Sequence, residues 1–291
     1  MSEISQTKWN LFKIVDQNVE EVKNHYREIE KEYTVEGKTL LLKEFIEFNK
    51  KNWCISINLK QSEINSFLIS GIYKNMYQVI EDDLRVLRRE QGLDISIEDA
   101  ARNRMGIHYG KRKTFENQFE DGDRFIYAAF SIGGLGLKKY GNFCLIIHQK
   151  EIEKFSSCAF LRKESIAYVD NDVLNIEQVK KDTANSKTVH LLAAIKNEKE
   201  IPDKAKEEWP EMICSEKDYI EALTIDEISV GHISTVRVSK ESENTYYNYL
   251  YKSYSSRLDE AEKRQLGNYR DMLKLLENNN INKETVDERG T

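Results

Sequence analysis

The chain has little proline, little cysteine and no long apolar run, and each absence excludes a class of protein. Only 2 prolines occur in 291 residues, so this is not a proline-rich linker. The 4 cysteines form no CxxC pair. We therefore expect no metal site and no disulfide framework, but free thiols in a reducing cytoplasm. Without a stretch of about 18 uncharged apolar residues, we expect no transmembrane helix and no membrane partner.

The N-terminus and the net charge bear on where the protein is located and on what it binds. The first ten residues lack a basic patch followed by an apolar run, so we expect no secretory signal peptide. The protein is then cytoplasmic, or an effector delivered without a signal peptide. A net charge of −6 argues against a general phosphate-tracking surface, although a local basic groove remains compatible with it.

Most of the glycines are concentrated in one segment of the chain. Of 13 glycines, 8 lie between Gly92 and Gly141. Glycine permits backbone conformations and close approaches that other residues resist. This segment is therefore the first candidate for a binding site.

The first region, residues 1–92, reads as helical. Seven apolar residues from Phe12 to Tyr33 follow alternating spacings of three and four, which predicts one long helix with an apolar seam. The seam would pack on another helix of the chain or form a coiled coil. Further helices are expected at Leu40–Trp53 and Ser62–Glu90, the last ending at Gly92.

Residues 93–240 read as an α+β domain. A short helix over 97–103 follows the capping pair Ser96 and Asp99. A second helix is expected over 187–198. Short apolar runs between turns predict strands, at 124–131, 142–148, 157–161, 165–169, 219–223 and 232–239.

Residues 241–291 read as one helix over about 244–277 that packs on the core, followed by a frayed polar tail. Tyrosines crowd the start of this helix, between Tyr246 and Tyr254. They would either pack the helix on the sheet or stack nucleic-acid bases.

Two segments in the middle region carry candidate chemistry. In the first, a strand ending at Ser131 leads into a loop with Gly133, two lysines and Tyr140. Such a loop is either a mobile hairpin or a cradle for an anionic ligand. In the second, Glu221 lies within a short apolar strand, which predicts a position at a sheet edge. It would there be a solvent-facing side chain or a catalytic carboxylate.

The order of these motifs resembles the ADP-ribosyltransferase fold, and most nearly bacterial toxins of the DarT-like branch, which modify nucleic acids. The resemblance rests on the segments His108-Tyr109-Gly110, Phe130-Ser131-x-Gly-Gly and Glu221-Ala-Leu. It covers about Met105 to Ser239. It implies a small mixed or antiparallel split β-sheet core, flanked by N-terminal and C-terminal helices.

The resemblance also implies roles for individual residues. Glu221 matches the catalytic glutamate. Either His108 or Arg124 matches the first motif, which holds the NAD ribose, and His108 is preferred. The remaining NAD contacts implied are Tyr109, Gly110, Ser131, Gly133 and Tyr140.

The implied activity is NAD-dependent transfer of ADP-ribose by a toxin or phage-defence effector. NAD is the co-substrate, no metal is needed, and the acceptor is a DNA, an RNA or a protein. An antitoxin or regulator is a further expected partner. Two other readings stay open: a non-enzymatic helical interaction protein, and a metal-independent ribonuclease toxin that uses His108 and a lysine.

Overall fold

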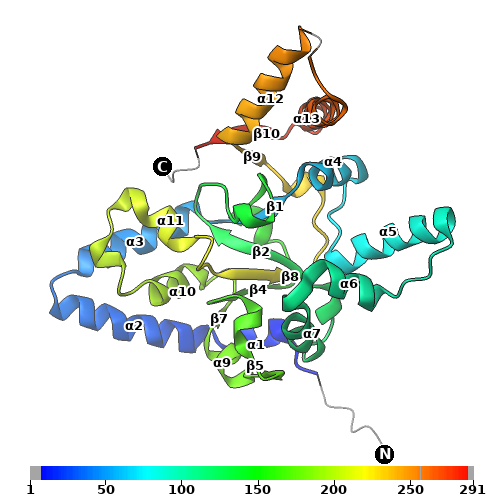
Figure 1. Cartoon of the computed structure of the whole chain (residues 1–291). Coiled ribbons are helices and arrows are strands. Elements are labelled where there is room, and N and C mark those ends of the chain that lie inside the picture. Colours follow the sequence, from blue (N-terminus) through cyan, green and yellow to red (C-terminus); the bar gives the residue numbers. More distant parts are fainter. Residues whose placement is uncertain (1–7, 256, 288–291) are drawn as a thin grey trace, which may run out of the picture.

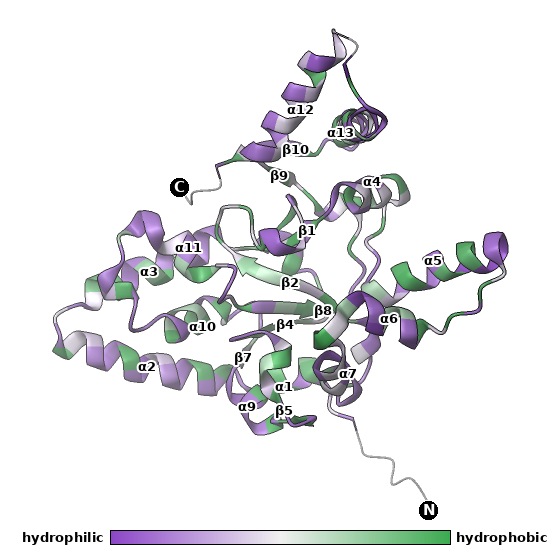
Figure 2. Cartoon of the chain, viewed as in Figure 1, coloured by the Kyte–Doolittle hydropathy of each residue, from purple (hydrophilic) through white to green (hydrophobic). Residues whose placement is uncertain are grey.

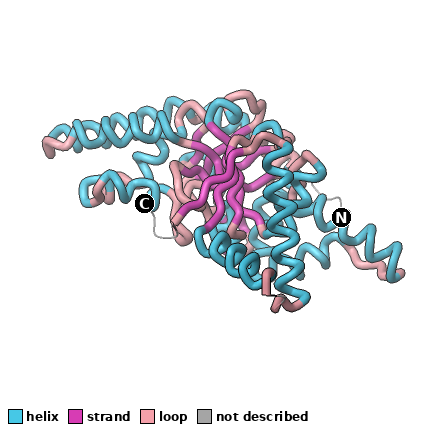
Figure 3. Tube along the Cα trace, turned by 90° about the horizontal axis from the view of Figure 1, so that it is seen from above, coloured by secondary structure: helices cyan, strands magenta, loops and turns pink. Residues whose placement is uncertain are grey.

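The computed structural model describes residues 8–255 and 257–287, and it shows a mixed α/β protein. One eight-stranded sheet lies at the centre, and helices pack around it (Figures 1 and 3). Among the described residues, no helix is both long and apolar enough to cross a membrane.

The sheet is ordered β10-β9-β3-β1-β2-β8-β4-β7, and its neighbouring strands are antiparallel except for the parallel pair β9 and β10. Its strands are β1 Cys54–Leu59, β2 Ile126–Ser131, β3 Phe143–His148, β4 Cys158–Leu161, β7 Thr183–Ala184, β8 Glu221–Thr224, β9 Thr235–Ser239 and β10 Asn282–Val286. A separate small hairpin joins β5 (Val169–Asp170) to β6 (Val173–Leu174).

Strands β1 and β2 stay paired for only half of their length. Pairing runs from Cys54 opposite Ser131 to Ser56 opposite Ala129 and then stops. Beyond that point, β1 continues on β3 as far as Leu59, while β2 continues on β8 as far as Ile126. The sheet therefore opens between the C-terminal half of β1 and the N-terminal half of β2.

Both faces of the sheet are covered by apolar packing. On one face, Trp53 stacks with Phe130 and meets Phe160 edge to face, within the larger core cluster. On the other face, Leu223 packs with Leu11 and Phe115. Removing this apolar area from water is the main favourable term in folding.

The helices on the first face belong to the larger core. They are α2 Val19–Val35, α3 Thr39–Asn52, α10 Val189–Lys196 and α11 Trp209–Ile213. The second face is covered by α1 Leu11–Gln17, α7 Tyr109–Asn117 and α9 Ile176–Lys181. A one-turn helix, α8 (Gln149–Ile152), follows β3.

Two further helix pairs lie beyond these layers. Helices α12 (Lys240–Ser253) and α13 (Glu260–Asn278) lie next to β9 and β10, and α13 packs on α4 (Gln61–Ser70). Helices α5 (Met76–Gln91) and α6 (Ile97–Met105) project to the side as a hairpin (Figure 1). In Figure 2, apolar and polar residues alternate along α2 and α5, as expected of amphipathic helices.

Several expected helices are interrupted, and the expectation of single long helices was wrong. The seam of Phe12 to Tyr33 is divided at Asn18, between α1 and α2. The helix expected at Ser62–Glu90 ends at Gly71, which has φ +78° and caps α4. Likewise, the expected C-terminal helix is two helices, α12 and α13.

Strand predictions fail at three places. The region expected to be only helical contributes β1, and β1 lies in the middle of the sheet. The strand expected at 165–169 is mostly a 3₁₀ turn, Ser165–Tyr168. Part of the tail expected to fray, Asn282–Val286, forms β10 beside β9; residues 288–291 lie outside the described part.

Candidate functional site

A cavity of about 540 Å³ lies where β1 and β2 separate. The C-terminal half of β1 and residues Tyr127–Ala129 of β2 form its sheet side. Helix α4, the start of α5 and the chain between them form the opposite side, and Arg104 and Arg112 approach from α6 and α7. Its size falls within the range of about 300–1,000 Å³ that is usual for small-molecule sites.

Glu221 lies in the wall of this cavity. Strand β8 lies between β2 and β4, with Glu221 opposite both Ala129 and Leu161, so the expected sheet-edge position was wrong. The residue is only 2% exposed. Its Oε2 accepts a hydrogen bond of 2.7 Å from the backbone N–H of Ser165. Its Oε1 lies 3.8 Å from Nη2 of Arg112.

The charge of Glu221 is set by opposing effects. Burial raises the pKa of this carboxyl above its usual value because the charged form loses water. Arg112 and the N–H of Ser165 lower the same pKa, since both favour the ionised form. The result is a desolvated carboxylate beside a cation, an arrangement that is common in catalytic sites.

Arg112 is held by its own surroundings. Its guanidinium carbon lies 3.4 Å from the centroid of the Tyr127 ring, a cation–π contact. The Tyr127 hydroxyl donates to Glu116 at 3.0 Å, and the Tyr77 hydroxyl donates to the same carboxylate at 2.6 Å. Arg112 and Glu116 are four residues apart on α7, so one helix supplies both charges.

Further tyrosines complete the lining of the cavity. Tyr219 donates a 2.6 Å hydrogen bond to Glu164, which also pairs with Lys139 at 3.0 Å. Tyr73 and Tyr140 line the same space. Aromatic faces of this kind suit a ligand with a flat ring.

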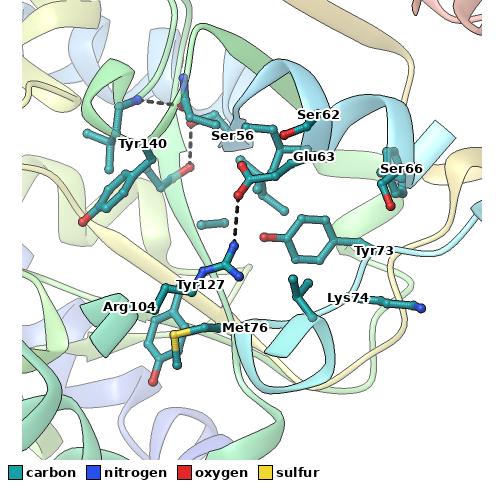
Figure 4. Close-up of a pocket in the computed structure, with 18 of the residues that line it drawn as sticks. Ser56, Ser62, Glu63, Ser66, Tyr73, Lys74, Met76, Arg104, Tyr127 and Tyr140 are labelled. Carbon is teal, nitrogen blue, oxygen red and sulfur yellow. Dashed lines mark hydrogen bonds and ion pairs between the residues drawn. The ribbon is translucent and has the colours of Figure 1, made fainter. Parts of the chain in front are cut away.

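A second ion pair crosses the cavity. Glu63 from α4 and Arg104 from the end of α6 point toward each other across it (Figure 4), and their closest atoms are 3.2 Å apart. Arg104 also lies 3.6 Å from Asp83. The pair links the projecting α5–α6 hairpin to α4.

Of the residues predicted for NAD, Tyr140 lines this cavity together with Glu221. His108 and Gly110 are exposed at the start of α7 and are not among the lining residues. Tyr109 is buried, and its ring packs in a small cluster with Ile80 and Leu84.

Arg124 does not begin a strand, as the sequence had indicated. It lies in a 3₁₀ turn before β2, and its exposed side chain pairs with Asp121 at 3.3 Å. Tyr109 and Arg124 both line another cavity, of about 620 Å³, beside the α5–α6 hairpin.

The glycine-rich loop with Ser131 and Gly133 crosses over β1. Ser131 is fully buried, and its hydroxyl donates to the Gly133 carbonyl at 2.9 Å. Asn58 holds the loop through three hydrogen bonds, to the carbonyls of Leu135 and Gly141 and from the N–H of Leu137. These bonds attach the loop to β1.

The sequence-based reasoning missed the residues that surround Glu221. Arg112 stands in a basic run, Lys111-Arg112-Lys113, and nothing marks it as the residue that pairs with Glu221. The available signal was its spacing of four from Glu116, on a helix that also carries the buried Phe115. Tyr127 and Tyr219 lie within or beside predicted strands, where the sequence indicates only burial.

Among the described residues, no three His, Cys, Asp or Glu side chains gather in a way that would hold a metal ion. No family model and no curated protein matches the chain.

Proposed function

We propose that the chain is an NAD-dependent ADP-ribosyltransferase, acting as a toxin or phage-defence effector on a macromolecular acceptor. One observation carries the proposal. Glu221 is a buried carboxylate that is paired with Arg112 in the wall of a cavity large enough for a small-molecule substrate. An antitoxin or regulator that restrains the activity belongs to the same proposal.

The separation of β1 from β2 supports the finer fold assignment, a split sheet of ADP-ribosyltransferase type. The two halves of the sheet are joined only from Cys54 to Ser56 on β1. Beyond this junction the opening exposes backbone and side chains of both halves to one cavity. A substrate in that opening contacts β1, β2 and β8 together.

The lining suits the chemical parts of NAD. The rings of Tyr73, Tyr127, Tyr140 and Tyr219 suit a planar nicotinamide or adenine ring. Lys74 and Arg104 supply positive charge for the pyrophosphate. These groups belong to the sheet side, the glycine loop, the segment between α4 and α5, and α6, so the substrate would contact all of them.

The proposed reaction exchanges one bond at the ribose carbon C1′ for another. The bond from C1′ to the nicotinamide nitrogen breaks, and the nitrogen keeps the electron pair. A nucleophilic atom of the acceptor then bonds to C1′ and loses its proton. Positive charge develops on the sugar, as in glycoside cleavage. Glu221 stabilises that charge, accepts a hydrogen bond from a ribose hydroxyl and orients the acceptor.

The test compares Glu221→Gln with Glu177→Gln, a matched change at an exposed glutamate on α9. Nicotinamide release from NAD is measured for each purified protein, and thermal unfolding shows that both are folded. We expect Glu221→Gln to reduce release by at least about 100-fold, a size typical of lost transition-state stabilisation. Glu177→Gln should match the wild type.

Two results would contradict the proposal. Equal nicotinamide release by Glu221→Gln and the wild type would remove Glu221 from the reaction. No binding of NAD to the folded wild type in calorimetry would remove the whole enzyme class. If binding is found, intact-mass measurement of DNA, RNA and protein acceptors after incubation with NAD identifies the acceptor.

A further inference from the structure

A second cavity, of about 390 Å³, lies on the other side of Tyr140 from the first. Its walls are the turn Lys138–Tyr140 with the next residues of the loop, the start of α4, and the facing sides of α12 and α13. Tyr140 lines both cavities, so the two are neighbours. Nothing in the proposed transfer reaction uses this second space.

One wall of the second cavity is aromatic. Tyr246 and Tyr249 are three residues apart on α12 and both line it. The Tyr246 ring stacks on Tyr269 of α13, with centroids 4.3 Å apart and planes inclined by 19°. With Tyr140 on the opposite wall, a planar group entering the cavity meets tyrosine rings on more than one side.

The polar part of the lining favours an anion. Three lysines, Lys60, Lys138 and Lys139, face a single glutamate, Glu241. Lys138 lies 3.6 Å from Glu241 and Lys139 pairs with Glu164, so the turn is ordered. By contrast, five acidic and two basic residues line the cavity beside Arg124. Lys60 at the start of α4 adds a further positive charge to the lining.

We infer that the second cavity binds a nucleotide, with its base stacked against the tyrosines of α12 and its phosphate held by the lysines. Gln61, Gln265 and Asn142 also line the space and offer amide groups to the base edge. The nucleotide is either a free molecule or one residue of a single strand. Both present the same ring and phosphate, and Tyr140 places either one next to the cavity that contains Glu221.

The test measures binding of AMP, adenosine and a short single-stranded DNA to the full chain by calorimetry, at two salt concentrations. Tyr249→Ala is compared with Tyr251→Ala, a tyrosine of the same helix that is 81% exposed and outside the cavity lining. We expect Tyr249→Ala to weaken AMP binding about tenfold, as for loss of one base–aromatic stack. Tyr251→Ala should bind as the wild type does. Lys60→Ala should weaken AMP binding severalfold and reduce its salt dependence.

Comparing the affinities of the ligands shows whether the nucleotide is a free molecule or part of a single strand. Tighter binding of the oligonucleotide than of AMP assigns the cavity to a strand, and equal or tighter binding of AMP assigns it to a free nucleotide. Three results overturn the inference: no saturable binding of either, equal losses in both tyrosine variants, or adenosine binding as tightly as AMP. Because the readout is binding at Tyr249, it is independent of whether Glu221 supports NAD cleavage.

Discussion

Glu221 is buried and pairs with the partly exposed Arg112, and the charges of the two residues depend on each other. A carboxylate alone at 2% exposure would keep its proton, since burial penalises the charged form. Arg112 at 3.8 Å and the Ser165 N–H make the ionised form accessible. The Tyr127 ring in turn lies against Arg112, and the Tyr127 hydroxyl donates to Glu116. The catalytic role proposed for Glu221 therefore depends on residues that would not touch the substrate's reacting atoms.

The first prediction concerns the pH dependence of nicotinamide release. Because the pKa of Glu221 is raised, the wild-type rate should fall with decreasing pH at a midpoint above the usual glutamate value of 4.5. Replacing Arg112 by glutamine removes the cation that lowers this pKa. The midpoint should then move to higher pH, with activity partly recovered in alkaline buffer.

The matched control is Lys111→Gln, which removes an exposed cation one residue away. Its pH profile should follow the wild type. An unchanged midpoint in Arg112→Gln would show that Arg112 does not control the charge of Glu221.

The second prediction separates the two roles of Tyr127. Tyr127→Phe keeps the ring beneath Arg112 and loses the hydroxyl donated to Glu116, so we expect a loss of about 1–2 kcal/mol in unfolding free energy. Tyr127→Leu also loses the cation–π contact, which adds about 2 kcal/mol. Urea denaturation at neutral pH measures both, and equal losses would argue against the cation–π contribution.

At the scale of elements, close packing of the glycine loop on β1 gives the cavity one of its walls. A Cβ on Gly141 would lie 2.0 Å from the Leu59 carbonyl oxygen, and one on Gly136 would lie 2.5 Å from Oδ1 of Asn58. The glycines are needed where the loop touches the strand. At these two positions, glycine allows the loop backbone to approach β1 closely.

The third prediction tests this packing through stability. Gly141→Ala should lower the unfolding free energy by about 2–3 kcal/mol, because the backbone of β1 cannot move away without disturbing the sheet. Gly267→Ala, within α13 with nothing near its added Cβ, should instead gain about 0.5–1 kcal/mol. Thermal melts of the two variants should shift in opposite directions, and a neutral Gly141→Ala would mean that the loop is free to move.

At the scale of the whole molecule, β1 connects the two halves of the sheet. It pairs with β3 along its length and with β2 at one end. Residues 54–59 come from residues 1–92, the part of the chain expected to be helical. The helical N-terminal part and the sheet are therefore parts of one fold.

The fourth prediction follows from this connection. A fragment of residues 93–291 lacks β1, so its two half-sheets lose their junction, and we expect no cooperative unfolding transition in circular dichroism. Adding a fragment of residues 1–92 supplies β1 and should restore the transition. Cooperative unfolding of the 93–291 fragment alone would show that the half-sheets assemble without β1.

Local pattern accounts for much of the secondary structure. Apolar runs located β2, β3 and β4 within a few residues, and helical spacing located most of α2, α3 and α10. Local pattern failed to predict a short strand that follows a helix directly, as β1 follows α3 after Trp53. No glycine or proline separates α3 from β1, so no turn signal marks the boundary. The helix ends at Asn18 and Gly71 were missed for a related reason, because the apolar spacing continues past the residue that ends each helix.

The sequence by itself determined the mixed α/β class, the segment rich in glycine and Glu221 as the carboxylate of interest. The class and the glycine segment follow from composition and local periodicity, which act over a few residues, whereas Glu221 was singled out by the motif resemblance. Only the tertiary structure decided that Glu221 is buried, that Arg112 is its partner, and that the glycine loop is fixed on β1 by Asn58. These are contacts between distant parts of the chain. They depend on strand order and register, and no local pattern encodes the separation of β1 from β2 that opens the cavity.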